Sequence, residues 1–270
     1  MPSPVRIHVL VDAAAAAPRF ATEWGLSLAI ELPDGLWLWD VGQSDAFLKN
    51  ARLMGLDLGR ARGLALSHGH YDHTGGLDAL FHDTGFRGLV FAQPEFIRTR
   101  YVIRPGETRE IGIPGLIPEY VTVRDTRELT KGLAMLTDIR RRAGLFQAVD
   151  GFFFDREGTE PDAIPDDAFL VLNTSKGAVV ILGCGHSGLS NSLASLEERL
   201  GIGRVHAILG GLHLFSAPES AWEETARAIE ASGCKQLWAG HCTGEKALEF
   251  LTGRLECEVR EMKAGMRVEF

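Results

Sequence analysis

The N-terminal third of the chain is a series of short apolar runs separated by turn signals. Runs of this length, bounded by Pro, Asp and Gly, predict buried strands, whereas apolar residues at intervals of three and four predict helices. The turn Pro33-Asp34-Gly35 predicts a hairpin between two of these strands. The expected strands are Val5–Val11, Leu26–Leu32, Leu36–Trp39, Leu64–Leu66 and Leu89–Ala92, and the expected helices are Phe47–Leu56 and one that begins with Leu77–Phe81.

Between about Pro94 and Pro165 the pattern changes. Prolines and glycines are frequent, aromatic residues recur, and only Tyr120–Val123 and Leu133–Thr137 have the character of strands. We interpret this segment as a cap or insertion at about residues 94–165, within a single domain that spans residues 1–270.

Regular alternation of strands and helices returns after Pro165. An α/β chain of this kind buries its sheets beneath helices, which predicts an αββα sandwich: two mixed sheets face to face, flanked by helices, with the functional site at their shared edge. The expected strands are Ala168–Leu172, Ala178–Leu182, Val205–Leu209, Gln236–Ala239, Cys257–Val259 and Met266–Phe270, and the expected helices are Ser190–Leu200, Pro218–Ser232 and Gly244–Leu251.

The composition and charge of the chain indicate which partners and which compartment to expect. The 270 residues carry a formal net charge of −8, and 45% of them are hydrophobic. This charge disfavours general attraction to nucleic acid or to an anionic membrane, so a small molecule is the expected partner. Four scattered cysteines indicate reduced thiols, and the N-terminus lacks the long apolar segment of a secretory signal, so we expect a cytoplasmic protein. A homo-oligomer is compatible with this sequence.

Three histidines and an aspartate follow the strand Leu64–Leu66 within six residues. They are His68, His70, Asp72 and His73. Crowded imidazoles repel one another when protonated, and crowding alone gives them no structural benefit, whereas neutral imidazole and carboxylate are ligands for zinc and related divalent ions. The sequence therefore predicts a metal site at the end of this strand.

Three later strands also end in a glycine-rich loop with a histidine. His186 and His241 are the candidates for further metal ligands. For His213, substrate contact or proton transfer, metal ligation and a structural role all stay open. Cys184 either binds or bridges metal as a thiolate or is an inert buried thiol, and Cys242 is expected to be structural or to support a ligand. The histidines outside these loops are interpreted as ordinary residues: His8, His82 and His206.

Asp40 comes directly after the strand Leu36–Trp39. A carboxylate in this position either supports a metal-bound histidine or caps the following helix.

The cap segment contains a locally basic stretch. A basic run is usually a solvated face, but it can also form a lid whose arginines contact a phosphate or carboxylate of the substrate. The candidates for such contacts are Arg98, Arg100 and Arg104, with Phe153 at the same mouth.

The spacing His-x-His-x-Asp-His followed by Gly-Gly resembles the signature of the metallo-β-lactamase fold superfamily. This resemblance implies one metal held by His68, His70 and His186 and a second held by Asp72, His73 and His241. It departs from the superfamily's pattern at one strand end, where many members have a bridging aspartate and this chain has Gly183-Cys184-Gly185-His186.

Motifs along most of the chain look like a subfamily labelled dihydropterin ribofuranosylaminobenzene phosphate synthase. They include Glu23–Leu28, Trp39–Ser44, Ser67–Leu77, Gly183–Gly188, Gly210–Leu214 and His241–Gly244.

The resemblance implies an enzyme that depends on a divalent metal. We expect two Zn²⁺ ions, with iron or manganese as alternatives, about 3.5–4 Å apart and holding a hydroxide that attacks a phosphoester, ester or lactone. Asp72 and His213 are the candidate catalytic groups. The alternatives are a synthase-like transferase, in which the metals bind a leaving diphosphate, and a non-catalytic metal or ligand sensor.

Overall fold

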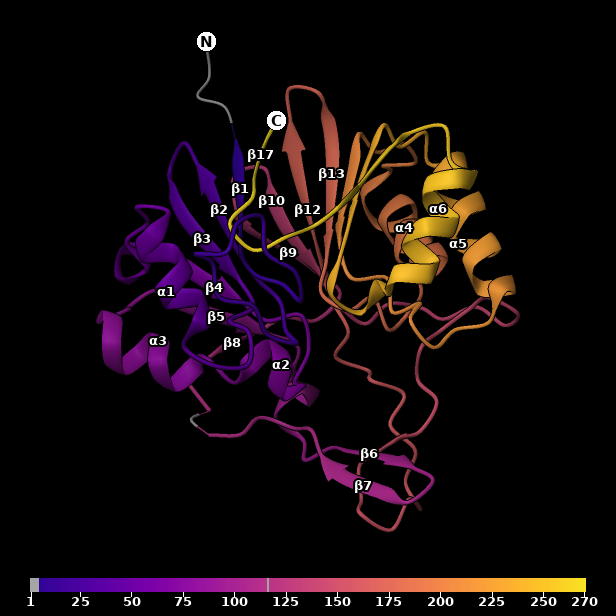
Figure 1. The fold of residues 1–270 in the computed structure, drawn as a ribbon, viewed down its shortest axis with the longest axis horizontal. Coiled ribbons are helices and arrows are strands. Elements are labelled where there is room, and N and C mark those ends of the chain that lie inside the picture. Colours follow the sequence, from indigo (N-terminus) through magenta and orange to yellow (C-terminus); the bar gives the residue numbers. More distant parts are fainter. Residues whose placement is uncertain (1–4, 116) are drawn as a thin grey trace. The chain divides into compact units, whose positions relative to one another are not determined.

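The computed structural model describes residues 5–115 and 117–270, which form two compact units. The first unit comprises the chain up to Thr122 together with Val149–Asp166 and Lys263–Phe270. The second comprises Val123–Ala148 and Asp167–Met262. Each unit contains one seven-stranded mixed sheet with its own helices (Figure 1).

The sheet of the first unit has the strand order β17-β1-β2-β3-β4-β5-β8. The pairs β1–β2 and β2–β3 are antiparallel, whereas β3, β4, β5 and β8 run parallel to one another. The strands are β1 (Arg6–Val11), β2 (Ser27–Leu32), β3 (Gly35–Trp39), β4 (Gly63–Ala65), β5 (Leu89–Ala92), β8 (Val121–Thr122) and β17 (Arg267–Glu269).

Two helices, α1 (Ala46–Leu53) and α3 (Leu77–Thr84), pack on this sheet through buried apolar side chains such as Phe47 and Leu80. Because β3 and β4 are parallel, their carboxyl ends lie at the same edge of the sheet. That edge carries Asp40 after β3, and after β4 it carries the loop that leads into the short helix α2 (Tyr71–Thr74).

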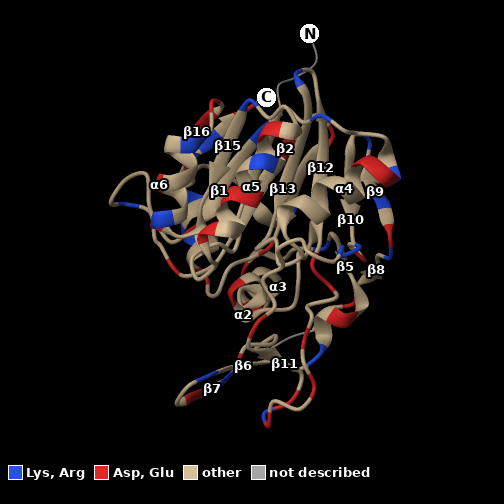
Figure 2. Cartoon of the chain, turned by 90° about the vertical axis from the view of Figure 1, so that its right-hand side faces the viewer, with Lys and Arg blue, Asp and Glu red and all other residues tan. Residues whose placement is uncertain are grey.

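A small three-stranded sheet also belongs to the first unit. Its order is β11-β6-β7, in which β6 (Tyr101–Arg104) and β7 (Glu107–Glu110) form a hairpin and β11 (Phe152–Phe153) pairs with β6. Charged side chains lie at the end of β6 and along β7 (Figure 2). Strand β7 consists of exposed polar and charged residues and lacks the apolar alternation of a buried strand, so the hydrophobic pattern does not predict this hairpin.

The sheet of the second unit has the order β16-β15-β14-β13-β12-β10-β9. Four of its strands, β13 to β16, are parallel, so the loops after β13, β14 and β15 leave from one edge. Three helices bury their apolar faces against it. The strands are β9 (Thr126–Thr130), β10 (Leu133–Leu136), β12 (Phe169–Thr174), β13 (Gly177–Leu182), β14 (Ala207–Gly210), β15 (Gln236–Ala239) and β16 (Glu258–Glu261), and the helices are α4 (Leu189–Leu200), α5 (Glu219–Ala231) and α6 (Glu245–Arg254).

The strands and helices predicted from the hydrophobic pattern are present, with shifts at their ends. Residues 94–165, which we predicted to be a cap, contribute β8 to the first large sheet, β9 and β10 to the second, and all of the small sheet. Within the described residues, no helix has both the length and the apolar character needed to cross a bilayer.

Candidate metal centre

In the first unit, the four predicted donors of the His-x-His-x-Asp-His motif lie on the loop after β4 and on α2, and all four side chains are buried. Hydrogen bonds donated by backbone N–H groups of this loop hold it against other segments of the first unit. The Tyr71 N–H donates to the Ile111 carbonyl at 2.9 Å, and the Gly69 N–H donates to the Asp166 carboxylate at 2.7 Å. A side chain at Gly69 would lie 1.9 Å from the Phe96 carbonyl oxygen, so only glycine fits between the two histidines.

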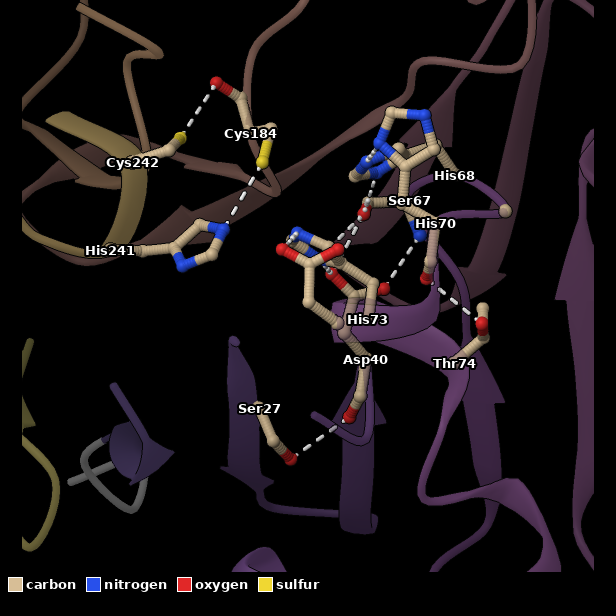
Figure 3. A network of polar contacts seen from close by, with 12 residues as sticks. Ser27, Asp40, Ser67, His68, His70, His73, Thr74, Cys184, His241 and Cys242 are labelled. Atoms are coloured by element: carbon tan, nitrogen blue, oxygen red, sulfur yellow. Dashed lines mark hydrogen bonds and ion pairs between the residues drawn. The ribbon is translucent and has the colours of Figure 1, made fainter. Parts of the chain in front are cut away.

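Asp40 supports a histidine of the motif. Its Oδ2 lies 2.7 Å from Nδ1 of His73, and both side chains are fully buried (Figure 3). A carboxylate accepts hydrogen bonds, so Nδ1 carries the proton and Nε2 carries the lone pair that a metal requires. The Nε2 atom lies 3.8 Å from Oδ2 of Asp72. Of the two roles considered for Asp40, the contact with histidine is the one observed, since α1 begins at Ala46 with Asp45 in the N-cap position.

His68 and His70 bring their ring nitrogens together. Nε2 of His68 lies 3.0 Å from Nδ1 of His70, and the rings are nearly perpendicular, at 73°. Two nitrogen ligands of one tetrahedral zinc ion, each at about 2.0–2.1 Å, are separated by about 3.3 Å. The two atoms are therefore close to the spacing that a shared ion requires.

In the second unit, His186 follows β13 and its Nδ1 lies 2.7 Å from the carbonyl oxygen of Ala148. A carbonyl oxygen only accepts, so Nδ1 is again protonated and Nε2 carries the lone pair. The ring of His213 lies 4.3 Å from that of His186, measured between centroids. His213 and His241 both adopt left-handed backbone conformations with φ of 47°, a strained state that is common at functional sites.

Cys184 and His241 are direct neighbours in the second unit. The Sγ atom of Cys184 lies 3.2 Å from Nε2 of His241, and Sγ of Cys242 lies 3.6 Å from the Cys184 carbonyl oxygen (Figure 3). Donor atoms of Cys184, His213 and Cys242 all lie within 4.8 Å of one another. Burial disfavours ionisation of the Cys242 thiol, but its hydrogen bond with Cys184 and the nearby imidazoles of His241 and His213 lower its pKa well below the usual value.

The candidate substrate residues of the basic segment have different surroundings. Arg100 is fully buried and contacts the carboxylates of Asp166 at 2.6 Å and Asp162 at 3.4 Å. These two carboxylates balance the charge of the Arg100 guanidinium group, so no substrate anion is needed for that purpose. Arg98 lies over the Phe154 ring and pairs with Glu160 at 2.7 Å.

Phe152 rather than Phe153 lies against the metal loop. The Phe152 ring is 5.3 Å from that of His70, and the guanidinium group of Arg104 lies 5.5 Å from the Phe152 ring. Adjacent strand residues point to opposite faces, so Phe153 points away and packs near Gly158.

Asp166 is a site residue that sequence reasoning missed. Its two carboxylate oxygens join Arg100 to the backbone of Gly69 in the metal loop. The sequence signal is weak, because the only unusual feature is an Asp pair directly after Pro165 and the contact spans 97 positions.

Comparison with known proteins identifies relatives along nearly the whole chain. A family profile described as the metallo-β-lactamase superfamily matches residues 25–197. A solved structure described as a metal-dependent hydrolase of the β-lactamase superfamily is 30% identical, covers 98% of this chain and 99% of its own, and superposes with a TM-score of 0.84. The metallo-β-lactamase fold protein YhfI from Bacillus subtilis, 14% identical over 99% of both chains, shares the fold with a TM-score of 0.62.

A curated relative is named as a synthase rather than as a hydrolase. The 7,8-dihydropterin-6-methyl-4-(β-D-ribofuranosyl)-aminobenzene-5'-phosphate synthase of Methanocaldococcus jannaschii is 26% identical over 98% of this chain and 97% of its own length. The predicted α/β fold class, with two mixed sheets flanked by helices, is confirmed by these matches, and so is the resemblance stated from the motifs.

Proposed function

We propose that this chain, which belongs to the metallo-β-lactamase superfamily, is a metal-dependent hydrolase of a small anionic ester. One observation carries the proposal. In the first unit, Asp40 accepts a hydrogen bond from Nδ1 of His73, so the lone pair of the ring is on Nε2, which lies 3.8 Å from the Asp72 carboxylate. Buried imidazole lone pairs beside a buried carboxylate are suited to a divalent cation and costly without one.

We further propose two ions for the centre. His68, His70 and His186 would hold one, and Asp72, His73 and His241 would hold the other. The donor chemistry fits, because the bonds to Asp40 and Ala148 set His73 and His186 in tautomers whose Nε2 can bind metal. Zinc suits these imidazole and carboxylate donors, with iron and manganese as alternatives. Ions held there would supply Lewis-acid polarisation and a water molecule of lowered pKa.

The chain's own residues have distinct roles in this proposal. Asp40 keeps His73 protonated at Nδ1 and holds its ring in place. His213 would move a proton to or from the reacting group, since its ring lies beside the ring of His186.

The positions of two arginines near the metal loop support the proposal that the substrate is an anion. Arg104 lies over Phe152, which contacts His70, and the Arg109 guanidinium donates to the Tyr71 hydroxyl at 3.3 Å. Val102, beside Arg109 in the hairpin register, packs with Phe152 and Tyr71, so the face that carries both arginines is turned toward the metal loop.

A transferase is the second candidate, and the relationship to the Methanocaldococcus jannaschii synthase favours it. In that reaction the same ions would bind a leaving diphosphate instead of activating water. Incubation of the protein with a pterin diphosphate and an aminobenzene riboside phosphate tests this candidate, and absence of a condensed product would count against it.

A substrate screen tests the hydrolase. Protein supplied with Zn²⁺ or Mn²⁺ is assayed on phosphodiesters, carboxylic esters and lactones. We expect hydrolysis by the wild type and by the matched control His82→Ala, which changes an exposed histidine on α3. The double variant His68→Ala/His70→Ala should stay folded but lose metal and activity. Retained activity in that metal-free variant would exclude metal-dependent hydrolysis, and metal binding without any turnover would favour a sensor.

A further inference from the structure

We propose that Asp166 and Asp167 are positioning residues of the metal centre, one for each of two loops that carry proposed ligands. Each carboxylate accepts a hydrogen bond from the backbone N–H that directly follows a histidine ligand. This inference rests on the proposed metal-dependent function, and it concerns how the ligands are held rather than which substrate they serve.

Asp166 holds the peptide after His68 in the first unit. Its Oδ2 accepts the N–H of Gly69 at 2.7 Å, and this N–H belongs to the peptide that joins His68 to Gly69. The other oxygen, Oδ1, lies 2.6 Å from a guanidinium nitrogen of Arg100, so a buried ion pair fixes the carboxylate itself. Because a peptide is planar, a bond to its N–H limits rotation of the backbone that carries the His68 ring.

Asp167 holds the equivalent peptide after His186 in the second unit. Its Oδ2 accepts the N–H of Ser187 at 2.7 Å, and its side chain is buried. Strands β12 and β13 are antiparallel with Phe169 opposite Leu182, so the residues before β12 lie beside the loop after β13. The sheet therefore places this carboxylate at the ligand loop.

Ala148 completes the support of His186 within the same unit. Its carbonyl oxygen lies 2.7 Å from Nδ1 of the ring, and its N–H donates to the His186 carbonyl oxygen at 2.8 Å. That carbonyl belongs to the same peptide as the N–H held by Asp167. The peptide is therefore held at both its oxygen and its N–H, and the ring is held at Nδ1.

The two carboxylates would serve one ion, because His68 and His186 are both proposed ligands of it. Asp166 and Asp167 are consecutive, so one dipeptide would orient ligands from two loops that are far apart in the sequence. Loss of an outer partner of a metal ligand weakens metal binding by roughly 10- to 100-fold. Loss of either carboxylate should therefore weaken the binding of this ion and spare the other.

Zinc affinity tests the role of Asp167 without an activity assay. Competition with a chromophoric chelator measures the affinity of each Zn²⁺-binding step. In Asp167→Ala, the step that is lost in His186→Ala should weaken by roughly 10- to 100-fold, while the other step stays the same. Asp138→Ala is the matched control and should leave both steps unchanged. Its carboxylate also accepts a backbone N–H in the second unit, that of Asp125 at 3.0 Å.

Two further variants separate positioning from stability. Asp167→Asn keeps an oxygen that accepts the Ser187 N–H, so it tests the role even where Asp167→Ala does not fold. A charge-assisted hydrogen bond is roughly twice as strong as a neutral one, so the loss of affinity should shrink to about 3- to 10-fold. In a His186→Ala background, Asp167→Ala should have no further effect on zinc, since the ligand that it positions is already absent.

Asp162 and Asp166 form a matched pair in the first unit. Both carboxylates contact Arg100, and of the two it is Asp166 that accepts the Gly69 N–H. Either Asn variant alters the ion pairs of Arg100. Asp166→Asn should also weaken the zinc step that is lost in His186→Ala, by about 3- to 10-fold, whereas Asp162→Asn should not.

The outcomes distinguish the positioning role from the metal-dependent function. Unchanged zinc affinity in both Asp167 variants, or equal weakening of both binding steps, would overturn the positioning role and leave the metal centre intact. Failure of the wild type to bind zinc at all would instead count against the function on which the inference rests.

Discussion

Asp40 accepts a hydrogen bond from Nδ1 of His73 at 2.7 Å, and neither side chain has any exposed surface. Ser67 strengthens the arrangement, because its hydroxyl and its backbone N–H both lie 2.7 Å from the Asp40 carboxylate. The backbone of Asp40 is in the left-handed region, with φ of 56°, which places the carboxylate there at a conformational cost. A buried carboxylate in this position orients a metal-binding ring.

Replacement of Asp40 by Asn should therefore weaken metal binding. An amide can also donate to His73, so the protonation of the ring is no longer fixed, and affinity for Zn²⁺ should fall by roughly 10- to 100-fold. Competition with a chromophoric chelator measures the change. Asp45→Asn is the control, because Asp45 pairs with Lys49 on α1 and should leave zinc affinity unchanged.

Replacement of Arg100 by Met should destabilise the fold. Arg100 is fully buried between the carboxylates of Asp162 and Asp166, and burial already raises the pKa of the Asp162 carboxyl. Removal of the cation leaves two buried carboxylates, which should cost about 3–5 kcal/mol in urea denaturation. Arg98→Met removes a partly exposed pair and should cost no more than about 1 kcal/mol. Equal losses in the two variants would be inconsistent with the buried ion pairs.

The histidine of β1 should make stability depend on pH. Burial lowers the pKa of His8, and the neighbouring Glu31 opposes this effect only in part. The unfolded chain, with a histidine pKa of about 6.5, binds this proton before the folded protein does. Stability should therefore be lost as the pH falls from about 6.5 through the lower folded pKa. Urea denaturation at several pH values should show that the wild type loses its stability relative to His8→Gln on acidification, and a widening advantage would reverse the assignment.

The hairpin arginines should influence substrate binding more than chemistry. In the double variant Arg104→Gln/Arg109→Gln, KM for an anionic phosphodiester should rise by up to about fivefold because exposed charge pairs are weak, with kcat little changed. KM for a neutral lactone should not move. Arg98→Gln is the matched control, since Arg98 already pairs with Glu160. An equal effect on both substrates would indicate a structural role for the hairpin.

The pattern of hydrophobic residues was sufficient to predict most of the strands and helices, and also some of the loops that carry the candidate metal ligands. Leu64–Leu66 is a buried run that ends in a histidine cluster, so both the strand and its loop could be predicted from adjacent residues. The same holds for the glycine-rich loops of His186 and His241, which follow apolar strands.

Contacts between distant segments could not be predicted in the same way. Phe152 and Phe153 are indistinguishable in sequence, and only the pairing of Phe152 with Val102 decides which ring faces His70. The burial of Arg100 could not be predicted, because its partners, Asp162 and Asp166, lie more than sixty positions away. A charge pattern read along the chain does not reveal burial.

Elemental analysis of protein purified without chelator tests the central claim most directly. The wild type should hold two divalent ions per chain, and His186→Ala and His73→Ala should each hold fewer. Dialysis of the wild type against a chelator should remove the metal and hydrolysis together. Wild-type protein that holds no transition metal, yet hydrolyses an ester at the same rate before and after the chelator, would contradict it.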